Sequence, residues 1–436
     1  MLETIRYYLQ KKNMDSLVTQ SLFTLLLRIF GVIVLFGFTF FLTHNFSPHV
    51  IGQYDFVRSY LFVIGSICLL GCDQSILYFK GRLSGTNSLD GFKNTYFKMM
   101  VLVLLSSLLL FLFFRIIDKA WITTFFDDAG VYPILFKSTA ILFFYAVTVL
   151  NTEVFRALDH LYLAELFRNT IKYLPVILGS IFLLKYGKET YLAEIFLYGF
   201  ILLAIITTLF IMYFFHKMEG TANSTSFSYK EITLKSYPIA VSGMAMFLLM
   251  SFDILFLKKY HDDATVAFYS IAVKIMTLLT MISLTVNITV SAKIAEYFAT
   301  KNDIEMHSII KKSVRLIVVI TAPVTLIMCL LSNQLLGFFG ENYKVATTAL
   351  LILIVGQGIC SIFGTATVYL NMTGRQAIFQ RILLVAVLIN FILNRFLIPK
   401  YGIIGAAIAF VSSTFFWNLC ATIIIYKKDK MKVYLN

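Results

Sequence analysis

Residues 397–407 read LIPKYGIIGAA and join two apolar runs, at 378–398 and 403–426. Each run has about the 20 residues that a helix needs to cross a hydrocarbon layer roughly 30 Å thick. Pro399 cannot continue a helix, and Gly402 allows the backbone geometry of a tight turn. The stretch therefore predicts two membrane-spanning helices joined by a short turn.

Runs of the same kind recur along the whole chain of 436 residues, of which 59% are hydrophobic and 14% charged. We expect twelve spans, near 21–43, 57–79, 97–117, 132–154, 161–184, 191–215, 235–257, 265–289, 314–336, 346–370, 378–398 and 403–426. The runs are too long for barrel strands and do not alternate apolar with polar residues. The sequence predicts an all-α integral membrane protein with about twelve transmembrane helices.

A weak internal repeat accompanies these runs. Lys-Tyr-Gly occurs at 185–187 and, 215 positions later, at 400–402, and at the same offset Tyr54 falls on Tyr269. Chance matching of so short a motif is the alternative explanation. A repeat of this length in an apolar chain is typical of secondary transporters.

The polar connection at 216–234 is the best boundary between the repeated halves. It predicts an N-terminal six-helix lobe at 1–220 and a C-terminal six-helix lobe at 221–436. With an even number of spans in each, the repeat is parallel, and we expect a cleft between the lobes that opens to one side at a time.

The formal net charge of +14 is distributed unevenly. Alternate connections hold about 23 Lys and Arg residues, whereas the intervening ones hold about seven. This positive-inside pattern predicts that both termini are cytoplasmic. The basic excess is explained by topology and by contact with anionic lipid headgroups, so we expect no nucleic-acid partner.

No pattern in the chain indicates an enzyme. There is no glycine-rich phosphate loop, no ATPase signature and no Ser/His/Asp set in one aqueous place, and no connection is long enough for a soluble catalytic domain. The five cysteines lie in predicted spans without the partners of a metal site. We expect no catalytic residue, cofactor or metal, and transport driven by an ion gradient, the membrane potential or the substrate gradient.

Ionisable residues inside the spans are the candidate site. Each costs roughly 2.5–3.5 kcal/mol even on a lenient insertion scale, and such residues usually face a bundle interior or a water-filled cavity. Four cations are predicted to line a cavity that binds an anionic headgroup: Arg28, Arg58, Lys172 and Lys274. Arg58 and Lys274 each lie about one turn past the repeated tyrosine of their lobe.

Acidic residues in the spans are fewer, namely Asp73, Glu153, Glu194 and Asp253. The interior is therefore expected to lean cationic. Asp253 is expected either to neutralise a neighbouring cation or to bind a coupling H⁺ or Na⁺, and the sequence leaves both roles open.

Several segments resemble one transporter family. They are Ala267-Phe268-Tyr269-Ser270-Ile271-Ala272, Leu336-Gly337-Phe338-Phe339-Gly340-Glu341-Asn342-Tyr343 and above all Leu397-Ile398-Pro399-Lys400-Tyr401-Gly402-Ile403-Ile404-Gly405-Ala406-Ala407. In these the chain is similar to the polysaccharide transporters, the Wzx-type flippases of the multidrug/oligosaccharidyl-lipid/polysaccharide exporter superfamily. The resemblance implies a MATE-like fold in a bacterial inner membrane.

The resemblance further implies a flippase that moves a polyprenyl-diphosphate-linked oligosaccharide of O-antigen, capsule or exopolysaccharide by alternating access. Fixed Arg and Lys side chains would lower the barrier that the diphosphate meets in the membrane. A polysaccharide polymerase and glycosyltransferases are further candidate partners. The alternatives are a cation-coupled multidrug antiporter of the same superfamily, whose cavity should lean acidic, and a non-transporting scaffold for polysaccharide assembly.

Overall fold

The computed structural model describes residues 2–84, 89–217 and 227–435, and over these residues the chain is helical, without strands. The all-α prediction is confirmed. The first half forms α1 (Leu2–Asn45), α2 (Pro48–Cys68), α3 (Cys72–Ser84), α4 (Leu89–Ile116), α5 (Lys119–Phe126), α6 (Val131–Ala157), α7 (Leu161–Asn169), α8 (Leu174–Tyr186) and α9 (Leu192–Lys217). The second half forms α10 (Tyr229–Tyr260), α11 (Asp263–Ala299), α12 (Asp303–Leu330), α13 (Ser332–Gly337), α14 (Thr347–Cys360), α15 (Ala366–Met372) and α16 (Gln376–Asp429).

Ten helical segments of the described residues are long and apolar enough to cross a membrane. The pair α2 and α3, bent by 41° where they meet, forms a further span. α16 contains two spans, because its 54 residues are interrupted at Gly402, which has non-helical backbone angles (φ 52°, ψ −129°). Counted in this way, the described part of the chain holds the twelve spans that hydropathy predicts.

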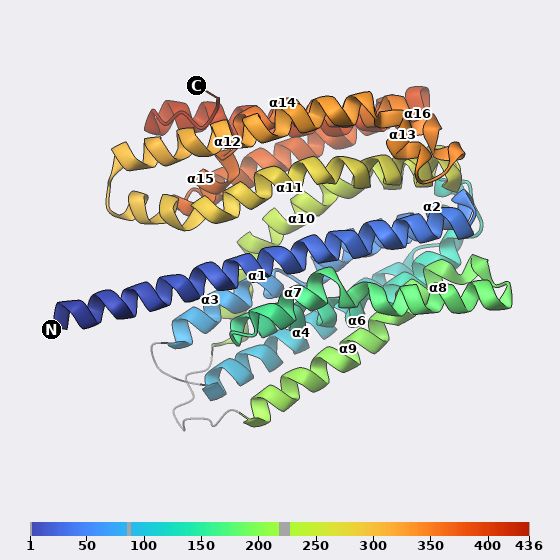
Figure 1. The fold of residues 1–436 in the computed structure, drawn as a ribbon. Helices are drawn as coiled ribbons and strands as arrows, with labels where there is room; N and C mark the ends of the chain where they lie inside the picture. The colour runs from blue at the N-terminus through green and yellow to red at the C-terminus, as the bar shows by residue number, and fades with distance from the viewer. Residues whose placement is uncertain (1, 85–88, 218–226, 436) are drawn as a thin grey trace. The chain divides into compact units, whose positions relative to one another are not determined.

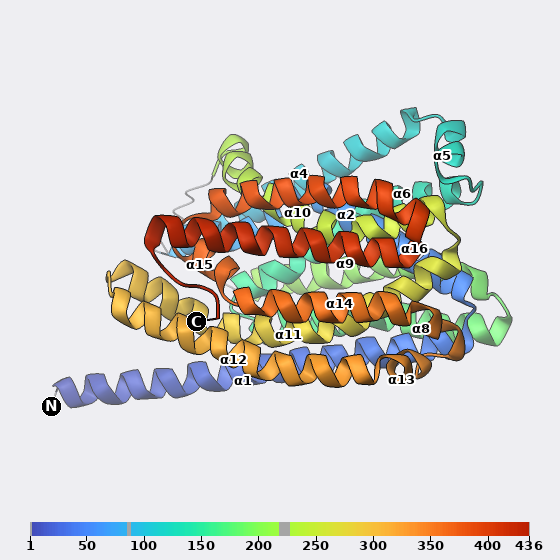
Figure 2. The same ribbon diagram turned by 90° about the horizontal axis from the view of Figure 1, so that it is seen from above.

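The turn predicted between the last two spans lies at Gly402. In Figure 2 the chain of α16 turns back on itself, so that its two arms run side by side. In a continuous helix the Ile398 carbonyl would accept from the N–H of residue 402. Beside this turn, Nε2 of His261 also lies 3.1 Å from that carbonyl, as a donor.

Three of the apolar runs are broken along their length. α2 and α3 are separated at Leu70 and Gly71, which have positive φ values of 50° and 76°. A 3-10 turn at Ile171–Tyr173 separates α7 from α8, and another at Ser361–Phe363 separates α14 from α15. Breaks of this kind leave backbone groups without helical partners, so they need partners from neighbouring segments. Accordingly, the Asn287 amide donates to the Gly364 carbonyl at 2.9 Å.

The helices group into two compact units. Unit 1 comprises Met1–Leu42, Ile67–Ile116 and Phe136–Ile239, and unit 2 comprises Thr43–Ser66, Ile117–Leu135 and Ala240–Asn436. The predicted lobe boundary at 220/221 falls within 218–226, outside the described residues. It stays a prediction, as do the parallel repeat, the cleft and the cytoplasmic placement of the termini.

Unit 2 has a continuous apolar core. Its helices α11, α12, α14 and α16 lie side by side (Figure 1), and α15 packs against α11 and α16. The core extends to the segment after α16, where Met431 and Val433 are buried. The Leu435 N–H donates to the Ile362 carbonyl at the break between α14 and α15, at 3.0 Å.

Candidate functional site

Two of the predicted cations meet on one buried carboxylate in unit 2. Lys274 of α11 donates from Nζ to Asp55 Oδ2 of α2 at 2.9 Å. Arg58 Nη2 lies 3.1 Å from Asp55 Oδ1. The Asp55 side chain is 0% exposed and that of Lys274 8%. We call Asp55, Arg58 and Lys274 the Asp55 cluster; its two cations and one carboxylate leave a formal charge of +1.

Local structure explains how the Asp55 cluster forms. Asp55 and Arg58 are three residues apart on α2 and therefore share a helix face. One turn earlier, Gly52 packs on the start of α11, where a Cβ at position 52 would lie 1.7 Å from the Asp263 carbonyl oxygen. Only a glycine permits this approach, which holds the beginning of α2 against α11.

A second group of charges, the Lys258 cluster, lies at the ends of the same helices. Lys258 Nζ, at the end of α10, lies 2.6 Å from Asp128 Oδ2 and 2.8 Å from Asp263 Oδ1. His49 Nδ1, at the start of α2, lies 3.4 Å from Asp263 Oδ2. The sequence placed Lys258 in a connection, but its side chain is only 5% exposed. The cluster thus joins α2, α10, α11 and the turn before α6.

The turn before α6 holds an acid with a perturbed pKa. Burial of Asp128 opposes its ionisation, but hydrogen bonds from Lys258 and from the Gly130 N–H outweigh this effect and lower the pKa below its ordinary value. The Asp128 carboxylate is therefore ionised at neutral pH and supplies one of the two negative charges around Lys258.

Arg28 is paired with an acid in unit 1. It donates from Nη2 to Glu165 Oε1 at 2.8 Å and from Nε to Oε2 at 3.1 Å. Glu165 also accepts from Asn169 Nδ2 at 2.8 Å, and Arg168 hydrogen-bonds to Glu153 nearby. A two-point pair of this geometry is among the stronger ionic contacts in proteins. Arg168 Nη1 also lies 3.8 Å from Glu165 Oε1, so Arg28 belongs to a larger group of paired charges in unit 1.

The expectation that the interior leans cationic omits two buried acids. The sequence analysis did not count Asp55 and Glu165 among the acids of the spans, yet both are buried and both neutralise predicted site cations. The sequence contains a feature that could have identified each acid. Asp55 directly follows the repeated Tyr54, and Glu165 lies inside the apolar run 161–184.

Lys172 has a different environment. It lies in the 3-10 turn Ile171–Tyr173, between α7 and α8, with Nζ 5.0 Å from the centre of the Tyr173 ring. A cation over an aromatic face is stabilised by about 0.5–1 kcal/mol at exposed sites. Lys172 belongs to unit 1, whereas the Asp55 cluster belongs to unit 2.

Asp253 is surrounded by neutral donors. Its Oδ2 accepts from the Tyr269 hydroxyl of α11 at 2.8 Å, and its Oδ1 accepts from Asn394 Nδ2 of α16 at 2.8 Å. Asn390, one turn before Asn394, points its amide at the same carboxylate at 3.5 Å. All four side chains are buried. We call them the Asp253 cluster.

The Asp253 cluster has the chemistry of a small-cation or proton site. Both asparagines present Nδ2 to the carboxylate, and Asn390 Oδ1 accepts from Asn394 Nδ2 at 3.0 Å. Carboxylate and amide oxygens are ligands that suit hard cations. Asn394 Oδ1 is buried and has no hydrogen-bond partner among the described residues. Among the described residues, the side chains that contact Asp253 are neutral, and both roles considered for it stay predictions. The sequence analysis missed Asn390 and Asn394, whose spacing of four in the run 378–398 places them on one face.

The two clusters share a helix. Tyr269 of the Asp253 cluster and Lys274 of the Asp55 cluster are five residues apart on α11, a rise of about 7.5 Å. A change at one cluster can therefore reach the other through a single rigid element.

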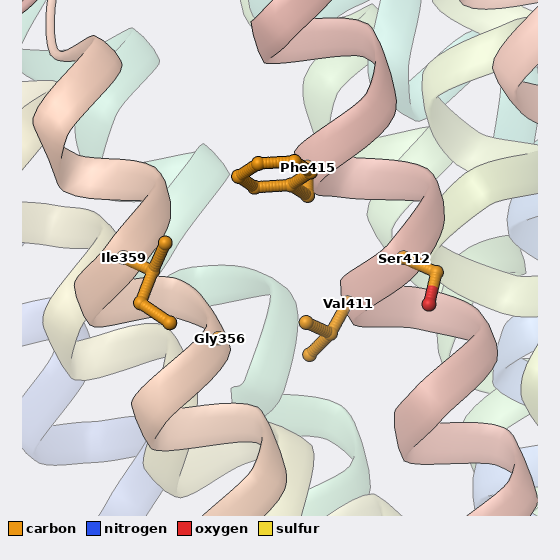
Figure 3. Close-up of a pocket in the computed structure, with 5 residues that line it drawn as sticks. All are labelled: Gly356, Ile359, Val411, Ser412 and Phe415. Carbon is orange, nitrogen blue, oxygen red and sulfur yellow. The ribbon is translucent and has the colours of Figure 1, made fainter.

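An apolar pocket of about 260 Å³ lies elsewhere in unit 2. Gly356 and Ile359 of α14 face Val411, Ser412 and Phe415 of α16 across it (Figure 3). None of the predicted site residues lines this pocket, and its single hydroxyl gives it no means of binding a charged headgroup.

Known proteins are similar to this chain in fold and, over part of its length, in sequence. The MatE family model matches residues 238–396. The "Probable low-salt glycan biosynthesis flippase Agl15" of Haloferax volcanii is 24% identical over 173 residues, which are 39% of this chain and 36% of that protein. The chain thus matches about a third of the length of this curated relative.

Two solved structures are similar over almost the whole chain. The Lipid II flippase MurJ, in an inward closed conformation, has a TM-score of 0.70 and 15% identity, covering 93% of this chain and 87% of that one. A multidrug resistance MATE family transporter of the MOP superfamily, in an inward-facing conformation, has a TM-score of 0.68 and 16% identity, covering 90% and 94%. The chain therefore has the fold of MATE transporters and of the flippase MurJ, and residues 238–396 match the MatE family.

Proposed function

We propose that the protein is a flippase that moves a polyprenyl-diphosphate-linked oligosaccharide across a bacterial cytoplasmic membrane by alternating access. The observation that carries this proposal is the Asp55 cluster, where Arg58 and Lys274 share one buried carboxylate. Two cations with a single negative partner suit an anion with several oxygens, such as a diphosphate. The Wzx-type resemblance and the names of two similar proteins, both described as flippases, support the same substrate class.

Ion coupling is the second part of the proposal. The Asp253 cluster would bind H⁺ or Na⁺, and α11 would transmit its occupancy to Lys274. An ion gradient would then bias the direction of lipid transport. The charges of the two clusters support these separate roles. The Asp55 cluster has a formal charge of +1, whereas the Asp253 cluster holds a carboxylate among neutral side chains.

A multidrug antiporter is the second candidate function. The MatE match and the MATE structural neighbours favour it, and a buried acid such as Asp253 is a feature that a cation exporter needs. The Asp55 cluster argues against it, because its surplus positive charge would repel a cationic drug.

Reconstitution in lipid vesicles tests the proposal. Translocation of a fluorescent undecaprenyl-diphosphate oligosaccharide would be compared between the wild type, Lys274→Met and Arg58→Gln. We expect both variants to lose most of the rate, while Lys400→Met, which removes an exposed lysine near the turn in α16, keeps it. Export of cationic dyes without transport of the lipid by the wild type would favour the antiporter.

A further inference from the structure

Asp55 pairs with the two cations that the substrate would need for binding. Its two carboxylate oxygens face two different cations, Lys274 at 2.9 Å and Arg58 at 3.1 Å. The Asp55 side chain is fully buried, so water does not take over these contacts. In the substrate-free protein, therefore, a carboxylate stands where the oxygens of a phosphate would be expected.

The same contacts tie two helices together. The bond from Lys274 to Asp55 joins α11 to α2, and Gly52 packs on the Asp263 carbonyl at the start of α11. His49 adds a further contact between the two helices at Asp263. Of these contacts, the Asp55–Lys274 bond is the one that an anionic ligand can replace, because the ligand offers the ammonium group another partner.

Resting on the proposed function, we infer that Asp55 is a built-in competitor of the substrate diphosphate, and that its displacement releases α2 from α11. A diphosphate carries more negative charge than one carboxylate and can accept from both cations at once. Once displaced, Asp55 is a buried charge without its partners, which is strongly unfavourable. The carboxylate must then move with α2 toward water, so that binding and helix movement occur together.

This arrangement also selects the cargo. A neutral lipid or a cationic drug has no negative charge that could replace Asp55 beside Lys274 and Arg58. It would therefore leave the contact between Asp55 and Lys274 intact. An anion with one weakly basic oxygen would compete poorly. The selectivity of the transporter would thus depend on the affinity of the headgroup relative to an internal carboxylate.

Binding of farnesyl diphosphate, a short-chain polyprenyl diphosphate, to the detergent-solubilised protein tests the competition. We expect Asp55→Asn to bind it about tenfold more tightly than the wild type, because the competing charge is gone. Asp55→Glu should restore the wild-type affinity, and Lys274→Met should weaken binding. The control is Glu341→Gln, which removes an exposed carboxylate paired with Lys344 and should change nothing. Equal or weaker binding by a folded Asp55→Asn variant overturns the inference.

Hydrogen exchange on the unmodified protein tests the release of α2 and does not depend on how a variant folds. Saturating farnesyl diphosphate should raise the amide exchange of peptides covering 48–54 and 263–268, with no rise in α9. Unchanged or slower exchange at 48–54 with the probe bound would overturn the release of α2.

The two proposals fail in different measurements. If wild-type vesicles transport the lipid but Asp55→Asn gains no affinity, the competitor role is wrong and the flippase function stands. If Asp55→Asn gains affinity and the probe frees α2, but wild-type vesicles move no lipid-linked sugar, the competitor role stands. The cargo is then another diphosphate.

Discussion

Arg28 and Glu165, 137 positions apart, form a two-point ion pair with bond lengths of 2.8 and 3.1 Å. Glu165 is only 1% exposed, so its charge depends on this partner. The pair links α1 to α7 within unit 1. The pair is therefore expected to stabilise unit 1. Mutation of both residues can distinguish this stabilising role from a role of Arg28 in substrate binding.

Arg28→Met should destabilise the protein by about 3 kcal/mol, because it leaves the buried Glu165 carboxylate without its strongest partner. The melting temperature of the purified protein in detergent measures the effect. The double variant Arg28→Met with Glu165→Leu removes both charges and should recover most of the loss. A double variant no more stable than Arg28→Met would show that the cost lies in packing.

Gly52 is expected to tolerate no side chain. A Cβ at this position would lie 1.7 Å from the Asp263 carbonyl oxygen, so Gly52→Ala forces α2 away from α11. We expect a clear drop in melting temperature and the loss of transport. Gly37→Ala is the matched control, since nothing lies within 4 Å of its added Cβ. There, a helix-forming residue should keep or raise the stability by up to about 1 kcal/mol.

The positions of the spans and the turn at Gly402 could be predicted because hydropathy, proline and glycine act locally. The partners of the charged residues could not. Asp55 and Lys274 are 219 positions apart, and no periodicity in the sequence indicates that they touch. The predicted internal repeat pairs Arg58 with Val273, one residue before Lys274, and matching positions in a repeat do not imply contact.

The breaks within spans were missed for a related reason. Leu70 is an apolar residue in a positive-φ conformation, and a hydropathy profile contains no signal for that. Gly71 beside it carries the only local hint. Only part of the Asp253 cluster can be predicted from the sequence. Asp253 is an acid within an apolar run and Tyr269 belongs to the repeat, whereas the two asparagines of α16 lie in an apolar run without a distinguishing pattern.

The Lys258 cluster should make stability depend on acidity through Asp128. Its pKa is lowered in the folded protein, so the ionised carboxylate contributes stability that is fully present above the ordinary value of about 3.9. That contribution is lost as the pH falls through the folded pKa. Melting temperatures of the wild type and Asp128→Asn should differ by a constant amount above about pH 5, and the difference should shrink as the pH falls below about 4 and through the folded pKa. A difference that stays constant between about pH 5 and pH 3 would assign the effect to another group.

Ion coupling should depend on the Asp253 cluster and be separable from substrate binding. Asp253→Asn keeps the shape of the side chain and removes its charge, so the site loses its ability to attract H⁺ or Na⁺. We expect transport in vesicles to become independent of imposed Na⁺ and pH gradients, while the affinity for farnesyl diphosphate stays within about twofold of the wild type.

The control for Asp253→Asn is Asn418→Ala, which removes a buried amide from the second arm of α16. Among the described residues, this amide donates to its own helix, at the Thr414 carbonyl. It should keep the dependence on the gradients. If Asp253→Asn also retains that dependence, the coupling ion binds elsewhere, and the carboxylate with its tyrosine and two asparagines serves to join α10, α11 and α16. Asp253→Asn could instead lose both the gradient dependence and more than twofold of the affinity for the diphosphate. That result would show that the two clusters are coupled along α11, between Tyr269 and Lys274, and are not separable.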